Sequence, residues 1–274
     1  MSSTLYVGRF APSPSGPLHF GSLVAALGSY LDARAQGGRW LVRMEDLDPP
    51  REMPGAADDI LRTLDVFALL HDGDVMYQSR RHEAYQAALD QLVEQGMAYP
   101  CACTRREIRE AGTPGGIYPG TCRNGLPPGR KARSVRLRVD DTITRFTDRL
   151  QGPVHENPGQ QAGDFILRRA DGLYAYQLAV IIDDAAQGIT DVVRGADLLD
   201  STCRQILLQH RLDLPTPDYL HLPVAVKPDG AKLSKQTFAA PLDRQQPTSQ
   251  LARALRFLGH PVPVALEREL PADF

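Results

Sequence analysis

One stretch, residues 8–23, limits the fold more than any other part of the chain. It reads Gly-Arg-Phe-Ala-Pro-Ser-Pro-Ser-Gly-Pro-Leu-His-Phe-Gly-Ser-Leu and follows a short apolar run, residues 5–7, which predicts a strand. From Leu23 to Leu31, apolar residues recur at helical spacing. A strand, a Gly- and Pro-rich turn and a helix start form the usual nucleotide site of an open α/β sheet, because the helix start offers N–H donors to phosphates. The alternative is a Pro-rich loop before an ordinary helix.

The end of this stretch carries a family resemblance. The run His19-Phe20-Gly21-Ser22 resembles the first signature of the class I aminoacyl-tRNA synthetases, and the preceding Arg-Phe-Ala-Pro-Ser-Pro resembles their glutamyl branch. The resemblance implies that His19 is catalytic and that His19, Gly21 and Ser22 bind ATP. The family signature has a second histidine where this chain has Ser22, and a hydroxyl can also donate a hydrogen bond.

Two further segments resemble the glutamyl branch. One is the acidic turn at residues 45–51, after a predicted strand at 39–44, and the other is the segment 164–197. The resemblance implies that Glu45 binds the α-ammonium group of glutamate, and it gives the rest of the glutamate pocket as Arg9, Ala11, Ser13, Tyr176 and Arg194. Two arginines suit a substrate with two carboxylates, because a guanidinium can bind a carboxylate bidentately. Which arginine binds which carboxylate stays open. Without the resemblance, the acidic turn at residues 45–51 would indicate an ordinary solvated loop.

A second signature is expected near residue 235. The run Lys-Leu-Ser-Lys-Gln at 232–236 follows a Pro-Asp-Gly turn and resembles the second class I signature with two positions changed. The resemblance implies that Lys232, Ser234 and Lys235 bind ATP, which arrives with Mg²⁺. Lys235 would stabilise the charge that develops on the departing pyrophosphate.

Three closely spaced cysteines lie in a loop-rich segment. Cys101, Cys103 and Cys122 favour Zn²⁺ over disulfides in a cytoplasmic protein. No histidine is near, so the expected fourth ligand is Tyr118, an uncommon one because a phenol has a pKa of about 10. A similar pattern occurs in shortened glutamyl-synthetase-like proteins, which implies one structural Zn²⁺ per chain. Three unrelated buried cysteines are the alternative, and Cys203 is expected in the core.

The segment from Arg123 to Arg149 is basic, with eight Lys and Arg against three Asp. Residues 134–139 alternate between polar and apolar, which predicts a strand with Arg136 and Arg138 on an outer face. That face is either an ordinary solvated sheet surface or a contact for RNA phosphates.

Charge and hydropathy exclude two other classes of protein. The net charge of −2 excludes a broadly basic coat for nucleic acid. No apolar run approaches the roughly 20 residues that span a bilayer, and the first residues do not resemble a signal peptide. We expect a cytoplasmic monomer that has no membrane partner.

The residues and the resemblance together predict an α/β class I synthetase-type Rossmann domain. Its halves are expected at 1–98 and 151–240, with an inserted zinc-binding, acceptor-contacting subdomain at 99–150 and a short helical C-terminus at 241–274. The resemblance is to truncated glutamyl-synthetase paralogues that lack the anticodon-reading region. It implies ATP-dependent formation of glutamyl-adenylate from L-glutamate, then transfer of glutamate to the queuosine base at the wobble position of tRNA(Asp).

Three alternatives remain for the function. The first is a minimal glutamyl-tRNA synthetase that charges the 3′ end of tRNA. The second is another amino-acid-activating or nucleotidyl-transfer enzyme. The third is a catalytically silent RNA-binding paralogue, which the two altered signatures bring into consideration.

Overall fold

The computed structural model describes residues 5–225 and 240–264, which divide into two compact units. The first unit draws on residues 1–79, 189–198 and 217–274, and the second on residues 80–188 and 199–216. The expected inserted segment, residues 99–150, lies within the second unit. Among the described residues, no helix is long and apolar enough to cross a membrane.

Parallel strands form the centre of the first unit. Strand β1 (Val7–Phe10) pairs in parallel with β2 (Arg39–Met44), and β2 pairs in parallel with the short β3 (Met76–Tyr77). Strands β9 (Asp191–Gly195) and β10 (Asp218–Leu222) form a second parallel pair. The Thr190 N–H donates to the Val7 carbonyl at 2.9 Å, so β9 begins beside β1. The sheet is therefore of the α/β kind that the first signature predicts.

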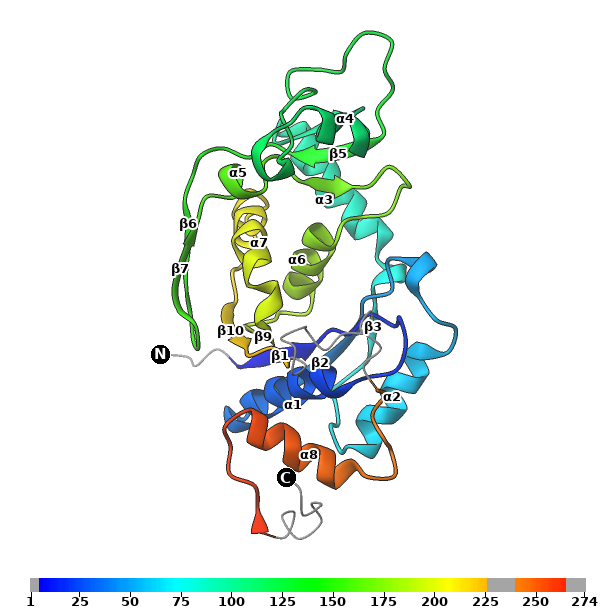
Figure 1. Ribbon diagram of the computed structural model, residues 1–274, viewed down its shortest axis with the longest axis vertical. Coiled ribbons are helices and arrows are strands. Elements are labelled where there is room, and N and C mark those ends of the chain that lie inside the picture. Colours follow the sequence, from blue (N-terminus) through cyan, green and yellow to red (C-terminus); the bar gives the residue numbers. More distant parts are fainter. Residues whose placement is uncertain (1–4, 226–239, 265–274) are drawn as a thin grey trace. The chain divides into compact units, whose positions relative to one another are not determined.

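The described part of the first unit also contains the helices α1 (Phe20–Ala35), α2 (Ala56–Val66) and α8 (Pro247–Phe257) (Figure 1). Helix α1 packs on β1, β2 and β9, and α8 packs on α1. Leu23, Leu27 and Trp40 belong to the buried core between α1 and the strands. A Cβ at Gly28 would lie 2.5 Å from a Leu222 methyl carbon, so the missing side chain lets α1 approach the end of β10.

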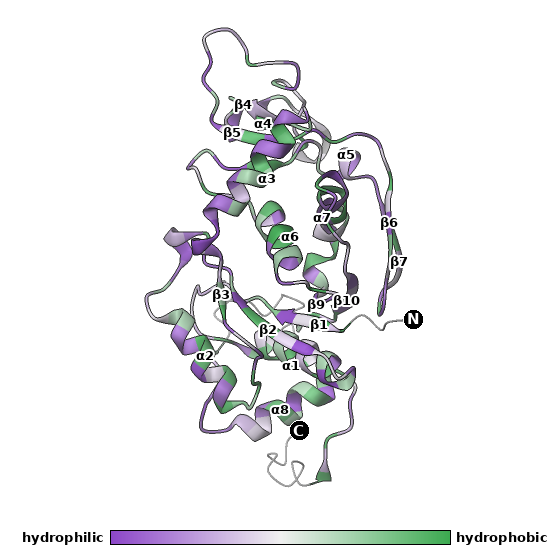
Figure 2. Cartoon of the chain, turned by 180° about the vertical axis from the view of Figure 1, so that it is seen from behind, coloured by the Kyte–Doolittle hydropathy of each residue, from purple (hydrophilic) through white to green (hydrophobic). Residues whose placement is uncertain are grey.

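The second unit contains antiparallel strands and further helices. Strands β4 (Ala98–Cys101), β5 (Ser134–Leu137) and β8 (Ile166–Arg168) form one sheet, and β6 (Thr144–Asp148) and β7 (Gly152–Glu156) form a hairpin. The helices are α3 (His82–Glu94), α4 (Arg105–Glu110), α5 (Pro158–Gln161), α6 (Tyr176–Ala186) and α7 (Leu199–Arg211). Figure 2 shows that α6 is mostly hydrophobic, in agreement with its four consecutive buried residues 178–181.

The first strand extends further than the sequence predicts. Residues 8–10 were expected in the turn, but they continue β1 alongside β2, and Arg9 pairs with Leu41. All four residues of β1 are buried, so backbone hydrogen bonding to β2 outweighs the turn preference of the glycine. Arg9 consequently belongs to a strand end and not to a flexible loop.

Candidate active site and metal centre

His19 occupies the N-cap of α1. Its backbone is extended, and its Nδ1 accepts the Ser22 N–H at 3.4 Å. Because Nδ1 is the acceptor, a neutral ring carries its proton on Nε2, which is then a donor suited to a phosphate oxygen. Gly21 and Ser22 lie in the first turn, where the N–H groups and the positive end of the helix dipole favour an anion. The structure thus brings these three residues together at one helix start.

The residues expected around glutamate in the first unit lie at the carboxyl ends of parallel strands. Arg9 on β1 is 3% exposed and Arg194 on β9 is 6% exposed. Glu45 directly follows β2, and its N–H donates to the Pro12 carbonyl at 2.9 Å, which places it beside Ala11 and Ser13. This edge of a parallel sheet is where open α/β folds bind ligands. The expected Tyr176 is the first residue of α6 in the second unit.

A buried histidine that the sequence did not single out contacts Arg194. His221 on β10 has no exposed surface, and its Nε2 accepts the Arg194 Nε–H at 3.1 Å. The Arg194 guanidinium carbon also lies 5.5 Å from the centroid of the Tyr219 ring. The register of β9 and β10 pairs Arg194 with His221, so the contact depends on a strand pairing that no local motif reveals.

A short segment that follows the second signature in sequence contacts the first signature. Lys232, Ser234 and Lys235 lie outside the described residues, but Pro241, six positions after Lys235, forms a bridge with His19. The neighbouring Leu242 N–H donates to the Leu18 carbonyl at 2.9 Å. The described chain that follows the second signature is therefore anchored beside His19.

Helix α8 also supports the first signature. The Phe257 ring meets the Phe20 ring edge-on, with centroids 5.9 Å apart. The Arg253 guanidinium carbon lies 4.6 Å from the centroid of the same Phe20 ring. Phe20, the residue after His19, is therefore packed by a helix from the far end of the chain.

In the second unit, the three expected cysteines form a cluster with Tyr118. The sulfur atoms of Cys101, Cys103 and Cys122 all lie within 4.8 Å of one another. The Tyr118 Oη lies 3.4 Å from the Cys101 Sγ and 3.7 Å from the Cys103 Sγ. Cys101 ends β4, whereas Tyr118 and Cys122 come from the long connection between α4 and β5.

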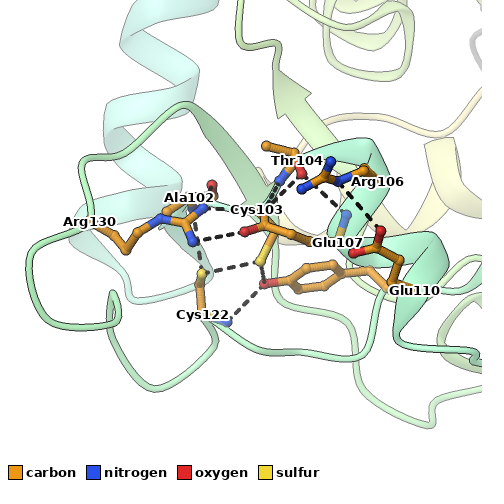
Figure 3. Close-up of polar contacts among 9 residues, drawn as sticks. Ala102, Cys103, Thr104, Arg106, Glu107, Glu110, Cys122 and Arg130 are labelled. Carbon is orange, nitrogen blue, oxygen red and sulfur yellow. Dashed lines mark hydrogen bonds and ion pairs between the residues drawn. The ribbon is translucent and has the colours of Figure 1, made fainter.

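The spacing of these atoms suits a tetrahedral metal ion. Zinc–sulfur bonds of about 2.3 Å set tetrahedral sulfur atoms about 3.8 Å apart, and the Cys103 and Cys122 sulfur atoms are 3.7 Å apart (Figure 3). The Ala102 N–H donates to the Cys122 sulfur at 3.4 Å, as in many sites where backbone amides support a thiolate. The four donors therefore fit Zn²⁺.

The surroundings favour a thiolate at Cys101. Burial alone would raise the pKa of this thiol, but contacts with Tyr118, the Cys103 backbone and Arg136 outweigh it and bring the pKa to about 7. Burial raises the pKa of the Tyr118 phenol, and its hydrogen bond with Cys101 acts in the same direction. The surroundings therefore stabilise the ionised form of Cys101, which is the form in which cysteine binds a metal.

Arg136 does not lie on an outer face, contrary to the alternation of residues 134–139. It is 6% exposed, its Nε donates to the Cys101 sulfur at 3.3 Å, and its guanidinium carbon lies 3.9 Å from the centroid of the Tyr118 ring. Tyr118, from the connection between α4 and β5, packs on this side of the strand, so the side chain of Arg136 is buried. Arg136 is consequently not available to RNA phosphates.

Comparison with known proteins identifies the family. The model for class I tRNA synthetases (E and Q), catalytic domain, matches residues 6–115 and 117–261. The chain belongs to this family. As a class I synthetase, it is an enzyme of the ligase type.

Several relatives share one name. A "Glutamyl-Q tRNA(Asp) synthetase" of Dechloromonas aromatica (strain RCB) is 63% identical over 98% of this chain and 91% of the relative. A protein of the same name from Ectopseudomonas mendocina (strain ymp) is 56% identical over 99% of this chain and 91% of the relative. The solved glutamate tRNA ligase of Elizabethkingia meningosepticum, in complex with its amino acid, has 29% identity and a TM-score of 0.76 over 87% of this chain. This synthetase spans only 54% of that ligase.

Proposed function

We propose that this synthetase activates L-glutamate with ATP and transfers the glutamate to the queuosine base at the wobble position of tRNA(Asp). The observation that carries the proposal is the 63% identity with a glutamyl-Q tRNA(Asp) synthetase over 98% of the chain. The buried arginines at two strand ends support glutamate as the substrate, because they offer one guanidinium for each carboxylate. Such an enzyme works in the cytoplasm, where tRNA is modified.

The first step forms glutamyl-adenylate. The α-carboxylate of glutamate attacks the α-phosphate of ATP, a new P–O bond forms, and the bond to pyrophosphate breaks. His19 and the start of α1 contact the phosphates, and Lys235 neutralises the leaving pyrophosphate, while Mg²⁺ accompanies the nucleotide. Glu45 binds the ammonium group of glutamate, and Tyr176 is proposed as a further glutamate-binding residue. Catalysis then consists mainly of positioning and charge neutralisation.

The thiol cluster is proposed to hold one structural Zn²⁺. Cys101, Cys103, Tyr118 and Cys122 would supply all four ligands, which leaves no open position for a reactive water. The ion would tie the end of β4 to the connection between α4 and β5. Elemental analysis of protein purified without added metal measures it directly.

Activation is tested by glutamate-dependent exchange between ATP and labelled pyrophosphate, without tRNA. We expect exchange with glutamate and at least tenfold less with glutamine, since a neutral amide leaves a buried guanidinium without its carboxylate. Exchange that requires tRNA would contradict the proposed site, and no exchange under any condition would indicate the silent RNA-binding paralogue.

The acceptor is tested with labelled glutamate and two forms of tRNA(Asp). One carries queuosine but has lost its 3′-terminal nucleotides by enzymatic trimming, and the other is an intact transcript without queuosine. We expect label on the first and none on the second, because single-stranded, extruded bases are the usual target of specific RNA recognition. The reverse pattern would identify a minimal glutamyl-tRNA synthetase.

A further inference from the structure

Arg136 is a buried cation that contacts two of the four proposed zinc ligands. Its Nε donates to the Cys101 sulfur at 3.3 Å, and its guanidinium carbon lies 3.9 Å from the centroid of the Tyr118 ring. Its Nη1 donates to the Asp164 carbonyl oxygen at 2.7 Å. Only 6% of the residue is exposed to solvent.

A buried guanidinium is costly unless a negative group lies near it. The carboxylate of Asp164, the residue whose carbonyl oxygen binds Arg136, accepts from Tyr99 and from the Val139 N–H and forms an ion pair with Arg123 at 3.3 Å. The contacts that remain to Arg136 are a carbonyl oxygen, an aromatic face and a sulfur atom. These partners leave the arginine poorly compensated if the cysteines are neutral thiols.

Metal binding would change that balance. Cysteine ligands bind as thiolates, so each one loses a proton when the metal enters. Three thiolates around a dication carry a net negative charge, and a guanidinium that touches one of them stabilises the loaded state. Hydrogen bonds from neighbouring groups to metal ligands also fix the orientation of those ligands.

We propose that Arg136 is an outer-shell positioning residue of the metal centre, which orients the Cys101 sulfur and offsets the charge of the thiolates. The proposal rests on the zinc centre proposed above. It assigns to Arg136 a role in holding the metal, whereas the sequence pattern had placed this residue on a solvent- or RNA-facing surface.

Arg138 provides a matched control. It directly follows β5, donates to the carbonyl oxygens of Gly96 and Arg123, and lies 5.3 Å from the centroid of the Tyr99 ring. Its contacts are thus of the same kinds as those of Arg136, except that none is to a cysteine. A merely structural arginine would affect zinc binding equally at either position.

The test measures the affinity of the reduced, metal-free full chain for Zn²⁺ by competition with a chromophoric chelator. We expect Arg136→Met to weaken zinc binding about 10- to 100-fold, as outer-shell changes usually do, and Arg138→Met to leave it within about twofold. Co²⁺ added to saturation should give the same thiolate-to-metal absorption in both variants, which shows that the ligands themselves are intact. Equal affinities of wild type and Arg136→Met, or equal losses at both positions, would overturn the proposal.

A second variant decides the matter if Arg136→Met does not fold. Arg136→Lys keeps the charge, so we expect it to lose less than tenfold in zinc affinity, and a greater loss would count against a role for the charge. A wild-type chain that binds no Zn²⁺ would refute the zinc centre itself. Equal zinc binding by the wild type and by Arg136→Met is a different result, because it would refute only the role of Arg136.

Discussion

His221 fixes the direction of Arg194 with one hydrogen bond. An arginine can only donate, so the Nε2 of His221 must offer a lone pair to the Arg194 Nε–H. This contact restrains the guanidinium of Arg194, which is one of the residues proposed to bind a carboxylate of glutamate. We therefore expect His221→Leu, a substitution of similar volume at a fully buried site, to raise the KM for glutamate about 10- to 100-fold, the range for a lost hydrogen bond to a charged group. The KM for ATP should change little.

His221→Gln serves as the rescue variant, because its amide oxygen can accept from Arg194. It should recover part of the glutamate affinity in steady-state exchange assays. If His221→Leu and His221→Gln behave alike, the hydrogen bond does not position Arg194.

Single residues also show where the sequence sufficed and where it did not. The three cysteines and Tyr118 were predicted as one cluster, and the structure places them together because the connection after α4 returns to the end of β4. Arg136 was placed wrongly, because alternation along one strand does not reveal what covers its second side. His221 was missed for a related reason, since its partner lies 27 positions away and reaches it only through strand pairing.

At the scale of elements, a carboxylate joins the end of α1 to the beginning of β2. The Asp72 carboxylate accepts from the Arg34 Nη1 and from the Trp40 N–H, each at 2.7 Å. Burial alone would raise the pKa of Asp72, but Arg34 and the Trp40 amide outweigh it and hold the pKa below its usual range. The stabilisation from this carboxylate is therefore complete above about pH 4, the unfolded value, and is lost as the pH falls through the lower, folded value.

We expect Asp72→Asn to lower the free energy of unfolding at pH 7 by about 1 kcal/mol, a value that allows for solvent screening at a site about one-third exposed. The difference from wild type should shrink as the pH falls below 4. Urea denaturation at pH 7 and near pH 3 measures both quantities. A difference that stays constant with pH would show that the charge of Asp72 contributes nothing.

The elements themselves were largely predictable. Strand β2 was expected at residues 39–44 and is found there, and α1 contains the apolar repeat that runs from Leu23 to Leu31. Their boundaries follow from strong local patterns. The end of β1 was not predictable in this way, because the strand pairs with β2 through residues 8–10, a segment whose composition favours a turn.

For the whole molecule, the distribution of charge is uneven. Residues 104–139 contain nine Lys and Arg against two Glu, although the complete chain has a net charge of −2. Arg109, Lys131 and Arg133 are exposed in this segment. Contacts to phosphates release counterions, so the affinity for RNA falls with salt in proportion to the number of contacts. This positive segment is our candidate for contact with the tRNA backbone.

A variant with Arg109, Lys131 and Arg133 all changed to Gln should bind tRNA(Asp) more weakly. Its plot of log affinity against log salt should be flatter by about 2–3, close to one unit for each lost phosphate contact. Exchange of pyrophosphate without tRNA should stay unchanged. Arg62→Gln, an exposed change on α2 of the first unit, provides the control, and an unchanged salt slope in the triple variant would exclude these residues from the RNA contact.

The packing of α8 against Phe20 also has a consequence for synthesis on the ribosome. Phe20 and Phe257 are separated by 237 positions, and chains grow at about 5–20 residues per second. The signature helix is therefore made first, and then waits about 12–47 s for the helix that covers it. During that time, Phe20 and the apolar residues that later pack against α8 are not yet buried by this helix. This enzyme thus gains the packing of α8 on its first signature only when nearly the whole sequence has been made.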